Sequence, residues 1–200
     1  MDVPSEALQG LWDQGWYRFA RRLDSPNFGA RPAGIAIDLV VIHSISLPPA
    51  TCEADYGKGY VQQLFTNTLD WDAHPYFETI RDQKVSSHFL IERTGELWQF
   101  VSCHERAWHA GQSSYTNKAG EIKNNCNDFS VGIELEGVPG QTFTDAQYES
   151  LASLNSALGL IYPALDFTGH EHVAPGRKDD PGSGFDWPRA MHEIGRSFAK

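Results

Sequence analysis

The chain has 200 residues, of which 40% are hydrophobic and 21% are charged, and its formal net charge is −10. This length and composition are typical of a folded globular protein, and we expect a single domain over residues 1–200. The acidic balance disfavours a nucleic-acid binder and a protein that docks on anionic lipid. No apolar run approaches the roughly 20 residues that a membrane span needs.

The N-terminus and the cysteines bear on the compartment. The first residues lack the basic start, apolar stretch and cleavage site of a secretory signal. The chain has three cysteines, Cys52, Cys103 and Cys126, so at least one thiol stays unpaired within it. Their spacing forms no Cys-x-x-Cys motif, which disfavours a thiolate zinc site. We therefore expect reduced thiols and a cytoplasmic location. Separately, we expect a monomer.

The first half of the chain predicts strands with few helices. Residues 1–34 look irregular, and the apolar, largely β-branched run from Ile35 to Ile42 predicts a buried strand that ends before His43. Residues 44–59 have the glycines and prolines of a loop, and residues 60–68 fit a short helix. The segments 88–93 and 96–101 flank Thr94-Gly95 and predict a hairpin.

The second half adds helices. The polar segment 112–127 looks like a surface loop, and residues 129–135 form another apolar strand. Thr144 and Gln147 make a capping box that opens an amphipathic helix, which Pro163 stops. A short strand over residues 166–169 precedes His170, and an amphipathic pattern runs from Trp187 to Phe198. Because a hairpin lies among interleaved strands and helices, we predict a mixed β-sheet flanked by helices.

Two of the eight histidines follow predicted strands, where a rigid scaffold presents functional groups. These are His43 and His170, and Asp180 comes ten residues after His170. Two imidazoles and one carboxylate leave one zinc position open for water, which is the pattern of a hydrolytic zinc site. By itself the pattern is weak, because many triples can be drawn from eight histidines.

The residue types leave several roles open. Glu134 and Glu136 lie on the same face of a predicted strand, so either could be a general base. In a strand His172 would lie on the same face as His170 and would compete as a ligand. His88 begins a strand, and we interpret it as a core histidine that bonds to backbone.

Motifs from about Ser25 to Trp187 carry a family resemblance, and they stand in the order that the family has. They are Val40-Val41-Ile42-His43-Ser44, Asp70-Trp71-Asp72-Ala73-His74-Pro75-Tyr76-Phe77, Ser87-His88-Phe89-Leu90-Ile91, Arg106-Ala107-Trp108-His109-Ala110-Gly111, Asn127-Asp128-Phe129-Ser130-Val131-Gly132-Ile133-Glu134-Leu135-Glu136, and Gly169-His170 through Gly176-Arg177-Lys178 to Asp180-Pro181-Gly182. With them the chain resembles the AmpD family of N-acetylmuramoyl-L-alanine amidases. The resemblance implies the mixed sheet flanked by helices that these amidases share with the peptidoglycan recognition proteins.

The resemblance also implies the site. It places one zinc ion on His43, His170 and Asp180, gives Glu134 the acid/base role, and gives Lys178 the stabilisation of the oxyanion. Zinc lowers the pKa of bound water to about 7, which would supply hydroxide for attack on an amide. The expected substrate contacts are Ser44, Lys84, Trp108, His109, Asn127 and Arg177. Ser44 and Lys84 depart from the family, where we expect Asn and Arg.

The implied reaction is hydrolysis of the lactyl–L-alanine amide of 1,6-anhydro-N-acetylmuramyl peptides in cytosolic peptidoglycan recycling. Removal of these muropeptides would lower the signal that induces chromosomal β-lactamase. The substrate is itself anionic, so the few basic residues near Lys178 have to reverse the local field.

Two other functions remain as alternatives. The first is a module of the same fold that binds peptidoglycan fragments without zinc, although such relatives typically lack a complete ligand set. The second is a cysteine peptidase acting through Cys126, which lies in an Asn-rich segment and not at a predicted helix N-terminus, where its pKa would be lowered.

Overall fold

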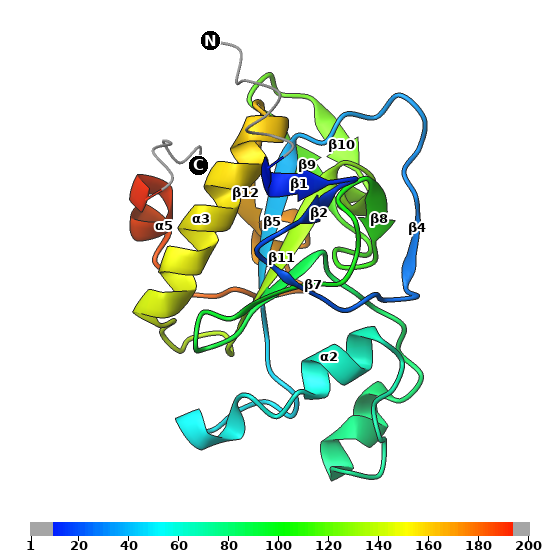
Figure 1. Cartoon of the computed structure of the whole chain (residues 1–200), viewed down its shortest axis with the longest axis vertical. Coiled ribbons are helices and arrows are strands. Elements are labelled where there is room, and N and C mark those ends of the chain that lie inside the picture. Colours follow the sequence, from blue (N-terminus) through cyan, green and yellow to red (C-terminus); the bar gives the residue numbers. More distant parts are fainter. Residues whose placement is uncertain (1–9, 194–200) are drawn as a thin grey trace.

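The computed structural model describes residues 10–193, and a six-stranded mixed sheet forms its centre (Figure 1). The strand order is β12-β5-β11-β6-β7-β3. The strands are β3 (Arg21–Arg22), β5 (Leu39–Ile45), β6 (Phe89–Ile91), β7 (Leu97–Gln99), β11 (Ser130–Glu136) and β12 (Asp166–Gly169). β12, β5, β11 and β6 run parallel, whereas β6 and β7 form the predicted antiparallel hairpin. The predicted mixed sheet is confirmed.

The central pair of strands, β5 and β11, is buried along most of its length. Leu39 to His43 are buried on β5, and all seven residues of β11 are buried. Near-continuous apolar runs of this kind are typical of parallel strands covered on both faces. A rigid, fully paired centre of this sort is suited to holding side chains in fixed positions.

One long helix, α3 (Asp145–Ile161), lies along the sheet with α5 (Trp187–Glu193) beside it (Figure 1). Thr144 accepts a hydrogen bond from the Gln147 backbone, so the predicted capping box is confirmed. Leu151, Leu154 and Leu158 of α3 pack into the main hydrophobic core against β5, β6 and β11. The predicted continuation of α5 to Phe198 lies outside the described residues.

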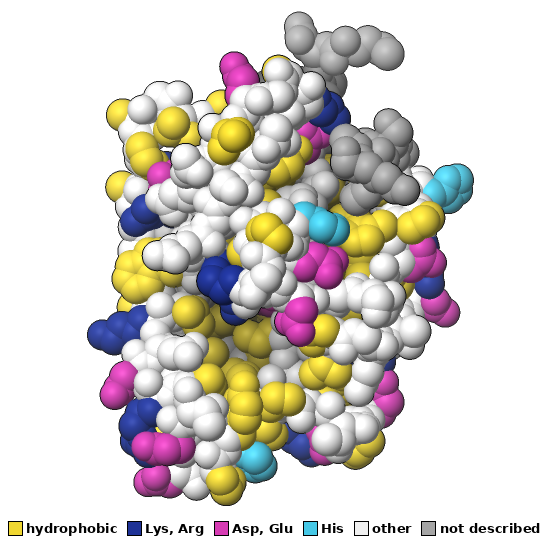
Figure 2. All heavy atoms as spheres, turned by 180° about the vertical axis from the view of Figure 1, so that it is seen from behind, with side chains coloured by type: hydrophobic (Ala, Val, Ile, Leu, Met, Phe, Trp, Pro, Cys, Tyr) yellow, Lys and Arg dark blue, Asp and Glu magenta, His cyan; other side chains and the backbone are white. Residues whose placement is uncertain are grey.

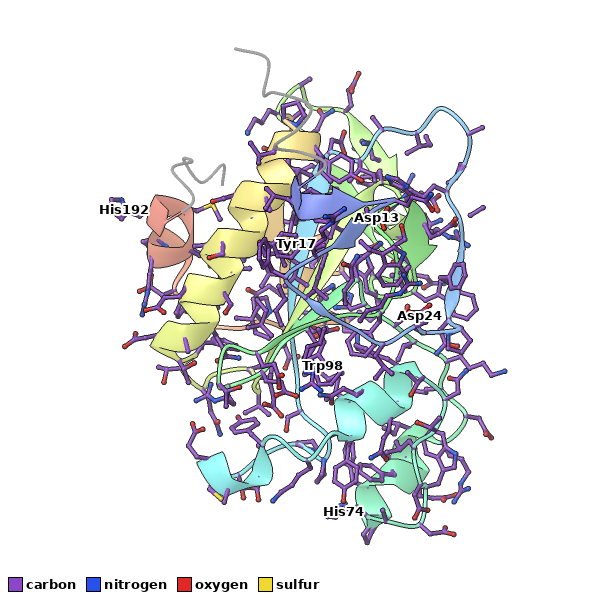
Figure 3. All side chains as sticks on the ribbon, viewed as in Figure 1. Asp13, Tyr17, Asp24, His74, Trp98 and His192 are labelled. Atoms are coloured by element: carbon purple, nitrogen blue, oxygen red, sulfur yellow. The ribbon has the colours of Figure 1, made fainter. Side chains whose placement is uncertain are left out.

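A second core joins the sheet to a lobe at the lower end of the molecule (Figure 1). The lobe holds η1 (Glu53–Asp55), α2 (Tyr60–Phe65) and η2 (Pro75–Ile80). Its apolar side chains pack against β6 and β7, and Trp98 of β7 lies between the sheet and the lobe (Figure 3). Seen from behind, hydrophobic side chains gather in this lower half of the molecule (Figure 2).

The sequence did not predict several short strands that the structure contains. The supposedly irregular residues 1–34 contain β1 (Trp12–Asp13), β2 (Trp16–Tyr17), β3 and β4 (Phe28–Ala30), and the supposed loop 112–127 contains the hairpin of β9 (Ser114–Thr116) and β10 (Ile122–Asn124). β4 pairs with β8 (Glu105–Ala107). Strands of two or three residues are defined by backbone pairing and are too short to show a period of two. No helix within residues 10–193 is long and apolar enough to cross a membrane.

Candidate active site

The candidate metal ligands come from adjacent parallel strands. His43 lies within β5, which extends to Ile45 and so does not end at Ile42 as expected. Gly169, the last residue of β12, pairs with Ile42, and His170 follows it directly. The parallel register therefore places the two histidines side by side, and their rings are 4.4 Å apart at the centroids.

Asp180 completes a compact cluster with them. His43 Nδ1 lies 2.9 Å from His170 Nδ1 and 3.0 Å from Asp180 Oδ2, and His170 Nδ1 lies 3.1 Å from the same oxygen. All three residues are buried. Among residues 10–193, this is the one group of three such side chains that could hold a metal ion.

Burial and mutual hydrogen bonding set the charges of the cluster. Burial lowers the pKa of His43 to about 4, against the opposing effect of the Asp180 carboxylate, which favours a protonated imidazole. Burial disfavours ionisation of Asp180, but hydrogen bonds with His170 and His43 outweigh it and hold the pKa of the carboxyl below its usual range. His43 thus offers a neutral imidazole and Asp180 an ionised carboxylate, which are the protonation states that metal binding requires.

Glu134 lies beside this cluster on β11. Its Oε1 is 4.0 Å from His43 Nδ1, and burial raises the pKa of its carboxyl well above the ordinary range, with a further contribution from Asp180. Glu136 is on the same face, as expected, but its carboxylate accepts hydrogen bonds from the backbone N–H groups of Gly57 and Arg93. The structure therefore brings Glu134, and not Glu136, to the cluster.

The structure removes His172 as a competing ligand. A short helix, α4 (His170–Val173), begins at His170, so the two histidines do not share a strand face. His172 is half exposed, and its Nδ1 accepts a hydrogen bond from the Gly169 backbone. The expectation of a shared face was wrong because it needed a strand that continued to His172, whereas β12 ends at Gly169 and a helix follows.

His88 is the core histidine that we expected. Its Nδ1 accepts from the Gly132 backbone N–H, and its Nε2 lies 3.1 Å from both the Arg31 guanidinium and the Glu105 carbonyl. Burial lowers its pKa to about 3, with a smaller contribution from Arg31. Both ring nitrogens are thus engaged inside the protein.

The cluster opens into a cleft of about 460 Å³ between the sheet and the lower lobe. The predicted site residues that line it are His43, Ser44, Trp108, His109, Glu134, His170, Lys178 and Asp180. Lys178 is exposed at the cleft, whereas the Ser44 hydroxyl is buried and has no hydrogen-bond partner within the described part of the chain. Most of the predicted site is thus gathered around one opening.

Three of the predicted substrate contacts do not line the cleft. The Asn127 side chain accepts hydrogen bonds from the backbone N–H groups of His109 and Ala110, and Arg177 donates to the Ala110 and Gln112 carbonyls. Lys84 is exposed, although its neighbours Gln83 and Val85 both line the cleft.

The comparison with known families bears on this geometry. The sequence profile of the N-acetylmuramoyl-L-alanine amidases matches residues 33–183, which include every ligand and acid described above. The chain belongs to this amidase family. It is accordingly an enzyme, a hydrolase that acts on amide bonds.

Individual amidases of this family match most of the chain. The 1,6-anhydro-N-acetylmuramyl-L-alanine amidase AmpD of Citrobacter freundii is 48% identical over 181 residues, which cover 90% of this chain and 92% of that protein. A crystal structure of a selenomethionine AmpD derivative superposes with a TM-score of 0.85 at 47% identity, covering 92% of this chain and 99% of that one. The Escherichia coli amidase AmiD was solved in complex with anhydro-N-acetylmuramic acid-L-Ala-D-gamma-Glu-L-Lys. It gives a TM-score of 0.55 at 27% identity, and the match covers 83% of this chain and 61% of that one.

The structure opposes the alternative of a cysteine peptidase. Cys126 starts the one-turn helix η3 (Cys126–Asp128), which the sequence did not predict, but its side chain is buried. Burial raises the pKa of this thiol, so the nucleophilic thiolate is disfavoured. Cys126 is therefore poorly suited to act as a nucleophile.

The sequence did not predict the apolar wall of the amidase cleft. Leu64 and Phe65 of α2 and Tyr76 and Ile80 of η2 line the cleft opposite the cluster. The aromatic side chains of the segment 71–77 were the available signal, but an aromatic stretch is usually core. Only the packing of the lobe shows which of them face the cleft.

Proposed function

We propose that this amidase is zinc-dependent and hydrolyses the lactyl–L-alanine amide of 1,6-anhydro-N-acetylmuramyl peptides. The observation that carries the proposal is the convergence of His43, His170 and Asp180 beside Glu134 at the floor of the cleft. The relatives whose names state this substrate cover nine tenths of the chain, which supports the same substrate class here.

The donor set fits zinc. The Nε2 of His170 lies 3.3 Å from the Ala110 carbonyl, which can only accept, so His170 donates from Nε2 and its Nδ1 is free to bind a cation. Within residues 10–193, the only polar side-chain atoms within hydrogen-bonding distance of His170 Nδ1 and Asp180 Oδ2 belong to the cluster, so these lone pairs converge on one point. Two imidazoles and one carboxylate are a ligand set of catalytic zinc sites, and zinc held there would supply Lewis acidity and a water acidified to a pKa of about 7.

Glu134 is the proposed general acid and base. Glu134, whose pKa burial raises, can accept a proton from the attacking water and then return it to the leaving amine of L-alanine. The neighbouring strand holds Glu134 in place, because Glu134 pairs with His43 in the β11–β5 ladder. The sheet therefore determines the distance between the proposed proton carrier and the candidate ligand His43.

Lys178 is the proposed stabiliser of the oxyanion. It lines the cleft two residues before Asp180, and its positive charge acts on both His43 and Glu134. As the scissile carbonyl becomes tetrahedral, its oxygen gains negative charge, and an ammonium group already at the cleft can donate a hydrogen bond to it.

We propose direct substrate contacts for two of the lining residues. The Ser44 hydroxyl has no partner within the described residues and would hydrogen-bond a polar group of the muropeptide once a side-chain rotation turns it into the cleft, and Trp108 offers an apolar face to the sugar. Lys84 contributes positive charge near the anionic peptide, whereas Asn127 and Arg177 act indirectly by holding the backbone of residues 109–112.

The proposed setting is peptidoglycan recycling in the cytoplasm, by a monomer, with an influence on β-lactamase induction where that circuit exists. Three unpaired thiols, two of them buried, are compatible with a reducing compartment. Light scattering of the purified protein tests the proposed monomer.

The decisive experiment is mass analysis of the products from 1,6-anhydro and non-anhydro muropeptides, with and without a chelator. We expect free peptide and anhydro-sugar from the anhydro substrate, loss of cleavage with chelator, and recovery on addition of zinc. His170→Ala and Asp180→Ala should behave like chelated protein, whereas His192→Ala, an exposed histidine on α5 (Figure 3), is the matched control. Full cleavage in the presence of the chelator would refute zinc dependence, and retention of intact substrate by zinc-loaded protein would favour a binding module.

A further inference from the structure

His109 lies against the candidate ligand His43, on the side of the ring that faces away from His170 and Asp180. Its Nδ1 is 2.9 Å from His43 Nε2, and its Nε2 is 3.1 Å from the Ser130 hydroxyl. The Ser130 hydroxyl is in turn 2.6 Å from the Cys126 carbonyl oxygen. These contacts form one continuous chain from a backbone carbonyl to the ligand.

The Cys126 carbonyl, at the end of this series of contacts, determines the direction of every hydrogen bond in the series. A carbonyl oxygen only accepts, so the Ser130 hydroxyl donates to Cys126, and its oxygen accepts from the Nε2–H of His109. A neutral imidazole carries one N–H, so the Nδ1 of His109 is bare and accepts from the Nε2–H of His43. His43 is then left with its Nδ1 lone pair directed at His170 and Asp180.

We propose that His109 is a positioning residue, which holds His43 in the tautomer and ring orientation that bind the metal ion. The inference rests on the proposed zinc site and adds to it a residue outside the ligand set. Histidine ligands generally donate their second N–H to a fixed acceptor, and that acceptor tunes metal affinity. Here the acceptor is a second imidazole whose own proton is held by Ser130.

The fold is built around the His109 ring. A Cβ added at Gly132, in the middle of β11, would lie 2.5 to 2.8 Å from ring atoms of His109, so the strand lacks a side chain where the ring packs. Asn127 holds the backbone of the same segment through the N–H groups of His109 and Ala110, at 3.2 and 2.7 Å. These contacts place the ring independently of any substrate.

The same segment orients both metal-binding imidazoles. The side chain of His109 accepts from His43, and the carbonyl of the next residue, Ala110, accepts from His170. Both nitrogens of His109 are engaged within the protein, and its Nδ1 faces His43 and not the cluster. His109 is therefore neither a fourth ligand nor a hydrogen-bonding contact for the substrate, although its ring lines the cleft.

The first test is the zinc dissociation constant, measured by competition with a chromogenic chelator. We expect His109→Leu to weaken zinc binding by about 10- to 100-fold, and His109→Asn, which can place an amide oxygen near the position of Nδ1, to stay within about fivefold of the unaltered protein. His88→Asn is the control, because His88 is a buried histidine whose ring nitrogens contact neither candidate ligand. Unchanged zinc affinity in His109→Leu would overturn the inference.

The second test needs no substitution. In ¹⁵N-histidine spectra of the metal-free protein near neutral pH, His43 and His109 should both be Nε2–H tautomers. An Nδ1–H tautomer of either residue would overturn the inference, even if His109→Leu does not fold. Failure of the unaltered protein to bind zinc would refute the proposed zinc site instead, and the spectra distinguish the two results.

Discussion

Glu134 on β11 lies directly beside His43 on β5, and the Glu134 Oε1 is 4.0 Å from the His43 Nδ1. The two residues are far apart in the sequence, but they are neighbours in a parallel ladder that spans the whole of both strands. The proposed proton carrier and one candidate metal ligand are therefore held by the same paired backbone. Loop motion does not set their separation.

Glu134→Gln should abolish most activity and leave metal binding intact. The amide keeps the shape of the side chain but cannot accept the proton, and general acid–base catalysis is typically worth 10²–10⁴-fold. We expect kcat to fall by about that factor, with a zinc dissociation constant close to that of the unaltered protein. A parallel loss of zinc affinity would contradict the assigned role.

Lys178→Met should lower kcat more than it raises KM. It removes the charge but keeps a long apolar side chain, and loss of one oxyanion donor typically costs about 10²–10³-fold in kcat. Lys118→Met is the control, since Lys118 forms a surface ion pair with Asp166 outside the cleft. Steady-state kinetics on the anhydro muropeptide measures both variants, and a change confined to KM would indicate a substrate-binding role instead.

Acid should destabilise the metal-free protein partly through His88. Because burial depresses the pKa of His88 to about 3 in the folded state, the stability that its neutral form provides is complete above the pKa of an unfolded histidine, about 6.5, and is lost as the pH falls toward 3. This one group contributes a slope of up to about 1.4 kcal/mol per pH unit.

His88→Asn should remove that slope, because the amide oxygen can accept from the Gly132 N–H but does not titrate. The free energy of unfolding from urea titrations between pH 4 and pH 7 measures the effect. His192→Asn, on the exposed face of α5, should keep the slope of the unaltered protein. Identical slopes in all three proteins would show that His88 does not control acid stability.

Gly132→Ala should destabilise the fold and weaken metal binding together. The new methyl group would overlap the ring of His109, which is held by Ser130 at the ring and by Asn127 at the backbone N–H. Overpacking of this kind typically costs about 1–3 kcal/mol. Gly140→Ala is the control. Gly140 has a positive φ but open space around it, so an added methyl group strains the backbone without overlapping another residue, and zinc affinity should stay unchanged. Thermal unfolding and chelator competition measure the two effects.

Local sequence patterns determined the main elements, and the family resemblance supplied the candidate site residues. The capping box of Thr144 and Gln147 predicted the start of α3, and the apolar run before His43 predicted β5, although β5 begins four residues later than expected. Such signals arise from contacts within a few residues, so one sequence is enough to read them. The family motifs named His43, His170 and Asp180, and the structure brings these three residues together.

The tertiary structure decided between residues that the sequence left equivalent. Glu134 and Glu136 share a strand face. Only the folded structure shows that the Glu136 carboxylate already accepts hydrogen bonds from the backbone N–H groups of Gly57 and Arg93. The position of His109 was equally hidden, because its contact with His43 depends on how distant strands pair and on the absence of a side chain at Gly132. The sequence alone therefore determines the residue types and the hydrophobic periodicity of each element. The hydrogen-bond partners depend on how distant strands pair, and a local sequence pattern holds no information on that pairing.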